Sequence, residues 1–221
     1  CKLKILFFTD THIRGNTPKN RKDNLTDTLE DKLDEIVEIS KEHNVDYILH
    51  GGDLFDRPDI SISIVNRFVS ILNNFEVPIY IICGNHDIYG HNPATVNRTM
   101  LGLFNEIGLL HLIKDREVIL LEKDNLTVQL TGQSYIYNLD DKLNRYRYIV
   151  NDVDNKANYT IHMVHGMLLD KPFIKGVPHT LIDDIKETKA DITLSGHYHS
   201  GFGIIKNTDK YFINPGSVIR I

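Results

Sequence analysis

Short apolar runs in the first half of the chain alternate with segments of helical periodicity, and each run ends in a polar cluster. The runs are "LKILFFTD", "VDYILHGGD" and "VPIYIICGNHD", which are typical of buried strands. Apolar residues recur at helical spacing at about residues 25–37 and 60–75, and a third helix is expected from Pro93 to Ile107. Strands that alternate with helices in this way predict a parallel sheet with crossover helices.

The second half of the chain is richer in strands than in helices. Apolar runs continue in "REVILLE", "LTVQLTGQS", "YTIHMVHG" and "ADITLSGH", and "GFGIIKNTDKYFIN" predicts a hairpin that turns near residues 207–209. Two sheets packed face to face, with helices on their outer sides, satisfy both halves. The predicted fold class is therefore α/β, a four-layer αββα sandwich of two mixed β-sheets, formed by residues 1–221 as one domain.

Composition limits the kinds of function that fit this chain. The net charge of −5 argues against a protein that binds nucleic acid through overall positive charge, although carboxylates that bind cations count in that sum. The apolar runs are too short to span a bilayer, so no membrane association is expected. The two cysteines, Cys1 and Cys83, lie at the terminus and in an apolar strand, which disfavours a disulfide and fits a reducing, cytoplasmic setting.

Polar side chains stand at the ends of five predicted strands. Open α/β sheets bind ligands beyond the carboxyl ends of their strands, so we expect these side chains to converge. Carboxylate, imidazole and amide oxygen without thiolate suit Mn²⁺, Fe, Zn²⁺ or similar ions. One tetrahedral ion cannot use them all, whereas two ions about 3.5–4 Å apart that share a carboxylate can. The candidate ligands are Asp10, His12, Asp53, Asn85, His165, His197 and His199.

The order of these clusters resembles the calcineurin-like metallophosphoesterase superfamily. Its D-x-H, G-D, G-N-H-D/E, H and G-H-x-H blocks correspond to "DTH", "GGD", "GNHD", "VHG" and "GHYH", and "NPGS" at residues 214–217 is a further match. The resemblance covers nearly the whole chain and implies that a hydroxide bridging two ions attacks phosphorus in line. It implies that the first ion is held by Asp10, His12 and His199, the second by Asn85, His165 and His197, and both by Asp53.

The same resemblance implies two catalytic residues. His86 would be the general acid, or the group that stabilises charge at the phosphoryl centre, and Asp87 would orient the His86 ring. The expected cofactors are two divalent metal ions, with Mn²⁺ as the first expectation and Fe, Zn²⁺ or Mg²⁺ as alternatives.

The residues around the blocks look most like those of the SbcD-type DNA-repair nucleases. "GDLFD" with a nearby proline, "HGMLL" and "IDDIKETKADITLSGHYH" carry this likeness, whereas Thr11 stands where the branch usually has an aromatic residue. The likeness implies a nuclease that cleaves DNA as an exonuclease or endonuclease, with homodimer formation and an ATPase partner as further expectations. SbcD-type chains continue into a capping domain, and none is expected within this sequence, which stops just after "NPGSVIRI".

Two other functions are compatible with the same residues. The chain can be a phosphodiesterase or phosphatase that acts on small molecules such as nucleotides, or on phosphoproteins. It can also be a scaffold that keeps the fold for partner binding. Such a scaffold is expected to have lost metal ligands, and every ligand of the pattern is present here.

Cations close to the predicted metal site favour nucleic acid as the substrate. The cationic side chains in the loop after "DTH" and after "GDLFD" can hold the phosphates on either side of the scissile phosphate. The tyrosine in "GHYH" can stack on a base or sugar. The alternatives are a solvated polar loop and a packed tyrosine. The candidate substrate contacts are Arg14, Lys19, Arg21, Lys22, Arg57 and Tyr198.

Several other residues are predicted to be structural. His162 would point to the opposite strand face from His165, and His50 is expected to be a satisfied buried histidine, with a supporting contact to the metal site as the alternative. Asp56 is interpreted as an acid that stabilises its loop. The apolar stripe at residues 64–75 is predicted to be helix core, with a homodimer seam as the alternative.

Overall fold

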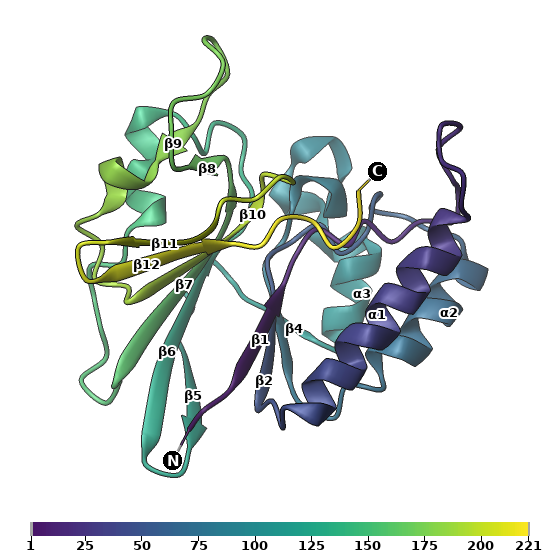
Figure 1. The fold of residues 1–221 in the computed structure, drawn as a ribbon, viewed down its shortest axis with the longest axis horizontal. Helices are drawn as coiled ribbons and strands as arrows, with labels where there is room; N and C mark the ends of the chain where they lie inside the picture. The colour runs from purple at the N-terminus through teal and green to yellow at the C-terminus, as the bar shows by residue number, and fades with distance from the viewer. Residues whose placement is uncertain (1, 221) are drawn as a thin grey trace.

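Two β-sheets packed face to face form the centre of the protein (Figure 1). The computed structural model describes residues 2–220, so the expectation that Cys1 is free of a disulfide lies outside the described residues, while Cys83 is a buried free thiol. The first sheet is wholly parallel. In spatial order its strands are β1 (Ile5–Phe8), β2 (Tyr47–His50), β3 (Ile79–Ile81) and β4 (His111–Leu112).

The second sheet is mixed. Two of its neighbouring pairs, β5–β6 and β11–β12, are antiparallel, and the other pairs are parallel. In spatial order its strands are β11 (Gly203–Asn207), β12 (Lys210–Asn214), β10 (Ile192–His197), β7 (Tyr159–Gly166), β6 (Leu126–Gln133) and β5 (Ile119–Lys123). A separate parallel pair consists of β8 (Leu168–Leu169) and β9 (Thr180–Leu181).

Helices lie on the outer side of each sheet, which confirms the predicted four-layer αββα class (Figure 1). Over the second sheet these are short 3₁₀ helices, because the chain there lacks the long apolar repeat of the first half. The helices are α1 (Leu25–Glu42), α2 (Ile62–Leu72), α3 (Met100–Glu106), and the 3₁₀ helices η1 (Asn85–Asp87), η2 (Tyr89–His91), η3 (Pro93–Arg98), η4 (Lys142–Tyr148) and η5 (Ile182–Ile185).

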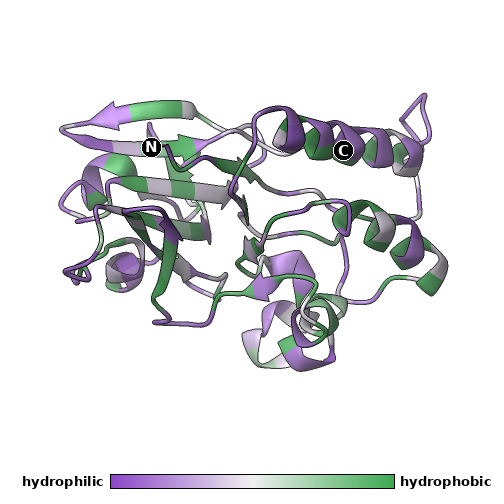
Figure 2. Cartoon of the chain, turned by 90° about the horizontal axis from the view of Figure 1, so that it is seen from below, coloured by the Kyte–Doolittle hydropathy of each residue, from purple (hydrophilic) through white to green (hydrophobic). Residues whose placement is uncertain are grey.

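The helices α1 and α2 each bury one apolar stripe against the first sheet. In α1, Asn24 accepts a hydrogen bond from the Asp27 N–H at 3.2 Å and so caps the helix, and Leu29 and Leu33 on its inner face are fully buried. Both helices also carry hydrophilic residues on their solvent side (Figure 2). In α2, Phe68 and its apolar neighbours are buried in the same core, so this stripe is helix core and not a homodimer seam.

The helix expected from Pro93 to Ile107 is wrong as a single element. It is divided into η3 and α3 at Thr99, whose backbone is extended at φ −105° and ψ 164°. The Thr99 hydroxyl accepts a hydrogen bond from the Gly102 N–H at 3.1 Å and caps the second helix. A local capping contact therefore outweighs the continuous apolar period, and the chain beyond α3 forms the short strand β4.

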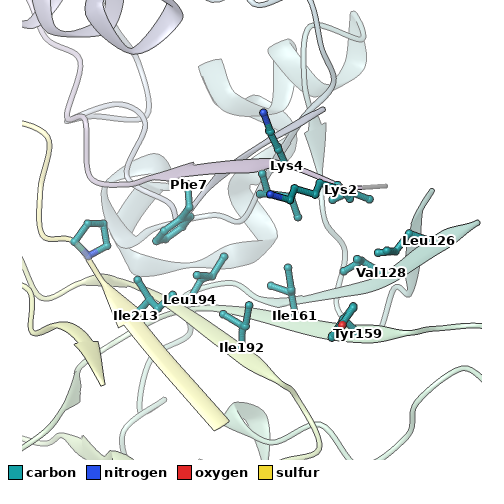
Figure 3. Close-up of a pocket in the computed structure, with 13 residues that line it drawn as sticks. Lys2, Lys4, Phe7, Leu126, Val128, Tyr159, Ile161, Ile192, Leu194 and Ile213 are labelled. Carbon is teal, nitrogen blue, oxygen red and sulfur yellow. The ribbon is translucent and has the colours of Figure 1, made fainter. Parts of the chain in front are cut away.

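A cavity of about 530 Å³ opens between the free edge of β1 and the inner face of the second sheet (Figure 3). It exists because the second sheet has six strands and the first has four, so part of the wider sheet is uncovered. Its walls are apolar and include Phe7, Ile161 and Leu194, and none of the predicted metal ligands lines it. In the part of the chain that the structure describes, no helix is long and apolar enough to cross a membrane.

Candidate dimetal active site

The predicted metal ligands lie together at one edge of the sandwich. The parallel strands of each sheet end at this edge, so the side chains that follow them meet there although they are far apart in sequence. They are Asp10 and His12 after β1, Asp53 after β2, Asn85 after β3, His165 near the end of β7, and His197 and His199 at and after the end of β10.

The first cluster consists of Asp10, His12 and His199. The Nε2 atoms of the two histidines are 3.0 Å apart. The Oδ1 atom of Asp10 lies 3.7 Å from His12 Nε2 and 3.5 Å from His199 Nε2. Asp10 and His12 are buried, whereas the His199 side chain is 46% exposed. The cluster is therefore closed on the protein side and open on the solvent side.

The second cluster consists of Asn85, His165 and His197. The Oδ1 atom of Asn85 lies 3.2 Å from His165 Nε2 and 3.1 Å from His197 Nδ1. Amide oxygen and imidazole nitrogen are suitable ligands for a first-row divalent ion. Three donor atoms from three strand ends thus face a common point.

Asp53 lies between the two clusters. Its Oδ2 atom is 3.6 Å from His12 Nε2 and 3.3 Å from His165 Nε2. Its Oδ1 atom accepts a hydrogen bond from the His86 N–H at 2.9 Å. Among the described residues Oδ2 has no hydrogen-bond partner, although it is fully buried. A buried carboxylate oxygen is costly without a partner, so the position of Oδ2 fits a cation on either side.

Asp10 shows the same division between its two oxygens. Oδ2 accepts hydrogen bonds from the Thr9 hydroxyl at 2.6 Å and from the His197 N–H at 3.1 Å. Oδ1, which faces the first cluster, has no hydrogen-bond partner within residues 2–220. The protein therefore satisfies one oxygen of each carboxylate and leaves the other directed at the position that a metal ion would take, so the donors fit the predicted ions.

The backbone at several of these residues is in the left-handed region. The φ angles are 54° at Asp10, 46° at His12, 56° at Asp53 and 88° at His197. Residues other than glycine are uncommon in this region, although Asp and His tolerate it better than most, and such residues gather at functional sites.

Contacts outside the clusters orient the imidazoles. The His12 Nδ1 atom lies 3.3 Å from Asp56 Oδ1, an electrostatic contact that leaves His12 Nε2 facing the cluster. Burial alone would lower the pKa of His12, but its contacts with Asp10 and Asp56 outweigh burial and raise the pKa to about 10. Burial opposes the shift at His165 too, and the Asp53 charge raises that pKa to about 9. The carboxylates of Asp10, Asp53 and Asp56 therefore stabilise positive charge at this site. Either protons on the histidine rings or a bound divalent ion can supply that charge.

Asp87 does not orient His86, contrary to the expectation from sequence. Its carboxylate accepts hydrogen bonds from the backbone N–H groups of Asp53 at 2.8 Å, Gly84 at 2.8 Å and Phe55 at 3.1 Å. Burial and the nearby Asp53 charge raise the pKa of Asp87 to about 7. Its geometry is that of a structural group, which ties the loop of Asp53 to the loop that carries Asn85 and His86.

Asp56 is the residue that approaches His86. The His86 Nδ1 atom lies 3.0 Å from the Asp56 carbonyl oxygen and 3.8 Å from its Oδ1. Asp56 therefore contacts both His86 and His12, and its interpretation as only a loop acid was incomplete. This role of Asp56 could have been inferred from the sequence, because Asp56 lies three residues after Asp53, on the same loop as a predicted metal ligand.

"NPGS" supports the loop of His199. Asn214 donates from Nδ2 to the Tyr198 carbonyl oxygen at 3.1 Å and accepts at Oδ1 from the Gly216 N–H at 2.9 Å. The Ser217 N–H donates to the His199 carbonyl oxygen at 2.9 Å. These bonds hold the main chain on both sides of the His199 ring, which is otherwise exposed to solvent.

The arginine side chains that were predicted to contact the substrate differ in their surroundings. Arg14 donates from Nη1 to Asp56 Oδ2 at 3.0 Å, and it lines a cavity of about 240 Å³ together with Arg57. Arg21 is engaged by Asp23 through two hydrogen bonds of 2.9 and 2.8 Å and by the Arg220 carbonyl oxygen. Arg21 is thus a structural contact of its loop rather than a free cation.

The two predicted lysines and the tyrosine lie on the surface. Lys19 and Lys22 are exposed, and the described residues form no ion pair with either. Tyr198 lies between His197 and His199 at the rim, and its ring centroid is 6.3 Å from that of Phe173. These residues stay candidates for contact with a substrate.

Two further histidines are structural, as predicted. His162 is buried and hydrogen-bonded to the Thr131 hydroxyl at 2.8 Å and to the Arg147 carbonyl oxygen at 2.9 Å. His50 is buried, accepts at Nδ1 from the Gly52 N–H at 3.1 Å, and lies 3.2 Å from the Thr11 hydroxyl. Burial lowers the pKa of His50 to about 3, so this ring stays neutral beneath the site.

Comparison with known proteins agrees with this geometry. A family model described as calcineurin-like phosphoesterase matches residues 3–201. The chain belongs to that family. Calcineurin-like phosphoesterases are hydrolases, and the histidine and aspartate clusters of this member indicate a dimetal site.

Distant relatives of this calcineurin-like phosphoesterase include DNA-repair proteins. The double-strand break repair protein MRE11 of Encephalitozoon cuniculi is 26% identical over 250 residues, which cover 99% of this chain and 42% of that protein. An uncharacterized metallophosphoesterase of Helicobacter pylori is 29% identical over 212 residues, which cover 90% of this chain and 45% of that protein. The chain thus spans less than half the length of each of these relatives.

Solved structures show the same fold in a phosphatase. A dimetal phosphatase from Danio rerio superposes with a TM-score of 0.61 and 12% identity, covering 98% of this chain and 88% of that one. At this identity the likeness shows the fold alone, so it leaves the substrate open.

Proposed function

We propose that this chain is a dimetal phosphodiesterase that cleaves DNA. The observation that carries the proposal is the unpartnered Oδ2 atom of Asp53, which faces His12 in one cluster and His165 in the other. A carboxylate oxygen in this position is suited to bridge two cations. The proposed ligands are Asp10, His12 and His199 for the first ion, Asn85, His165 and His197 for the second, and Asp53 for both.

The proposed ions are divalent, with Mn²⁺ first and Fe, Zn²⁺ or Mg²⁺ as alternatives. The donors are carboxylate, imidazole and amide oxygen, and this mixture without thiolate suits first-row ions. When bound, the two ions supply an activated water and neutralise the charge that develops on the phosphate oxygens. Side chains of the protein would bind the substrate and transfer a proton to the leaving oxygen.

His86 is the proposed general acid. Its Nδ1 atom faces the Asp56 carbonyl oxygen, which can only accept, so Nδ1 carries a hydrogen and Nε2 is the free ring nitrogen. The His86 side chain is 42% exposed, so a substrate can reach it. A ring held in this way can carry a proton at Nε2 and transfer it to the leaving oxygen.

DNA is the proposed substrate for two reasons. The relative from Encephalitozoon cuniculi is a double-strand break repair protein that aligns along 99% of this chain. The side chains of His86 and His199 are also 42% and 46% exposed and so accessible to a long substrate, and Arg57 lines a cavity with Arg14, which contacts Asp56. A homodimer and an ATPase partner, as in SbcD-type systems, are part of this proposal.

The test compares hydrolysis of a labelled single-stranded oligonucleotide, bis-p-nitrophenyl phosphate and p-nitrophenyl phosphate with and without Mn²⁺. The protein should cleave the two diesters when Mn²⁺ is present. Asp53→Asn should lower this turnover by at least about 100-fold, since it removes the charge shared by the ions. Asp46→Asn is the matched control, because Asp46 pairs with Lys123 away from the site.

Two results would contradict the proposal. Strong monoester turnover with an intact oligonucleotide would replace the nuclease with a phosphatase. Wild-type diester turnover by Asp53→Asn would refute the dimetal assignment.

A further inference from the structure

The loop between β8 and β9, residues 170–179, carries an exposed apolar tip. Phe173 is 36% exposed, Ile174 67% and Val177 37%. The loop rises at the edge of the second sheet where β10 ends, which is the edge that carries the metal clusters (Figure 1). Exposed apolar side chains that gather at one place on the surface mark a candidate contact surface.

This loop is held in one shape by its own hydrogen bonds. The His179 Nδ1 atom lies 2.8 Å from the Val177 carbonyl oxygen, and His179 Nε2 accepts from the Phe173 N–H at 3.4 Å. The tautomer with its hydrogen on Nδ1 satisfies both contacts. At the base of the loop, Thr180 donates from its hydroxyl to Asp140 at 2.8 Å. The tip is therefore presented in a prepared position, which lowers the entropy lost when a ligand binds.

The tip of the loop contacts Tyr198, which neighbours two predicted metal ligands in the sequence. The rings of Phe173 and Tyr198 are 6.3 Å apart at an interplanar angle of 71°, an edge-to-face pair. In such a pair the edge of one ring covers only one face of the other, and both side chains are partly exposed to solvent. In the sequence, Tyr198 lies between His197 of the second cluster and His199 of the first.

The charges of the loop favour an anionic ligand. Lys171 and Lys175 flank Phe173, and both are exposed. Neither lysine forms an ion pair with any residue from 2 to 220. Acidic residues are absent from the sequence between Asp170 and Asp183. Aromatic rings interleaved with cations are the combination that binds single-stranded nucleic acid, the rings stacking on bases and the cations pairing with phosphates.

We propose that Phe173 and Tyr198 form a stacking subsite for an unpaired nucleobase next to the phosphodiester at the metal centre. The subsite rests on the proposed nuclease function and narrows its substrate to single-stranded nucleic acid or to frayed ends. A base inside a duplex is stacked on both sides and offers no free face to the loop. The lysines of the loop hold the phosphates on either side of the stacked base.

The test measures binding of two labelled oligomers of equal length and charge by fluorescence anisotropy in EDTA. One oligomer is oligo(dT), and the other consists of abasic units, so the two differ only in their bases. Wild-type protein should bind oligo(dT) more tightly. Phe173→Ala should reduce the ratio of the two affinities by between about fivefold and about 150-fold, the loss expected for one stacked base.

Two more variants separate stacking from packing. Phe173→Leu keeps a large apolar side chain in the loop but has no flat ring, so it should reduce the ratio as Phe173→Ala does. Tyr159→Ala is the matched control, because Tyr159 is 55% exposed and begins β7 at the opposite end from the metal clusters. It should keep the wild-type ratio.

The subsite is overturned if wild-type protein binds the two oligomers equally, or binds neither, or if Phe173→Leu keeps the wild-type ratio. Cleavage of oligo(dT) with Mn²⁺ is scored separately. Protein that prefers oligo(dT) but leaves it uncut would refute the nuclease function while supporting the stacking subsite.

Discussion

The Nδ1 atom of His165 lies 2.7 Å from the main-chain carbonyl oxygen of Gly51. A carbonyl oxygen only accepts, so Nδ1 carries a hydrogen, and in the neutral form of the ring Nε2 presents its lone pair to the second cluster. There it meets Asn85 Oδ1 at 3.2 Å and Asp53 Oδ2 at 3.3 Å. Three electron-rich atoms at these distances repel one another unless a proton or a cation lies among them.

His165→Ala should therefore reduce the metal content of Mn²⁺-loaded protein from two ions per chain towards one. The second cluster loses one of its donors, whereas the first cluster keeps all of its own. Metal content is measured by elemental analysis after dialysis, with His111→Ala as the control at an exposed histidine. Two ions in His165→Ala would contradict the assignment of the second cluster.

Asp56→Asn should weaken binding of the first ion through His12. Asn keeps the size of the side chain but removes the charge that faces His12 Nδ1 at 3.3 Å. Loss of such a supporting carboxylate typically costs about 10- to 100-fold in metal affinity. Competition with a chromogenic chelator measures the affinity. The control is Asp59→Asn, at a residue that lines the cavity of Arg14 and Arg57. Equal affinities of the two variants would exclude this role for Asp56.

Gly84→Ala should displace the carboxylate of Asp53 and lower the affinity for both ions. A Cβ atom at residue 84 would collide with Asp53 Oδ1 and with the Asp53 backbone nitrogen. Gly108→Ala provides the control, because Gly108 has φ 77° and open space around its Cα. That change should cost about 1 kcal/mol of stability through backbone strain alone. Normal metal content in Gly84→Ala would show that Asp53 is free to shift.

His162 should make the folded protein less stable in acid. Burial lowers its pKa, and its hydrogen bonds from the Thr131 hydroxyl and to the Arg147 carbonyl hold the neutral ring. In the unfolded chain a histidine takes up a proton near pH 6.5. Below that pH the unfolded state binds more protons, so the free energy of unfolding falls by up to about 1.4 kcal/mol per pH unit.

Urea unfolding of wild-type protein and His162→Gln, at several pH values on both sides of 6.5, measures this contribution. The variant is expected to be less stable throughout, because it loses a hydrogen bond, but to lose less stability as the pH falls. Parallel pH dependences of the two proteins would show that His162 does not contribute.

Much of the site could be predicted because its residues are tied to strand ends. Asp10, Asp53, Asn85, His165 and His197 each close a short apolar run, and parallel strands bring such positions to one edge whatever their separation in sequence. Residue type then indicates metal chemistry, since carboxylate, imidazole and amide oxygen are donors for the same ions. The four-layer fold could be predicted for a similar reason, because it follows from the periodicity of apolar residues along the chain.

The sequence by itself thus determined which side chains meet at this edge and that their donor atoms suit divalent metal ions. Only the tertiary structure decided what each side chain touches. Asp87 bonds to backbone N–H groups while Asp56 approaches His86 and His12, and Phe173 reaches Tyr198 from a distant loop. Capping at Thr99 also divided a helix that looked continuous. Periodicity is a property of neighbours along the chain, whereas a hydrogen bond or ring contact depends on directions and distances of a few ångströms that only the packed fold defines.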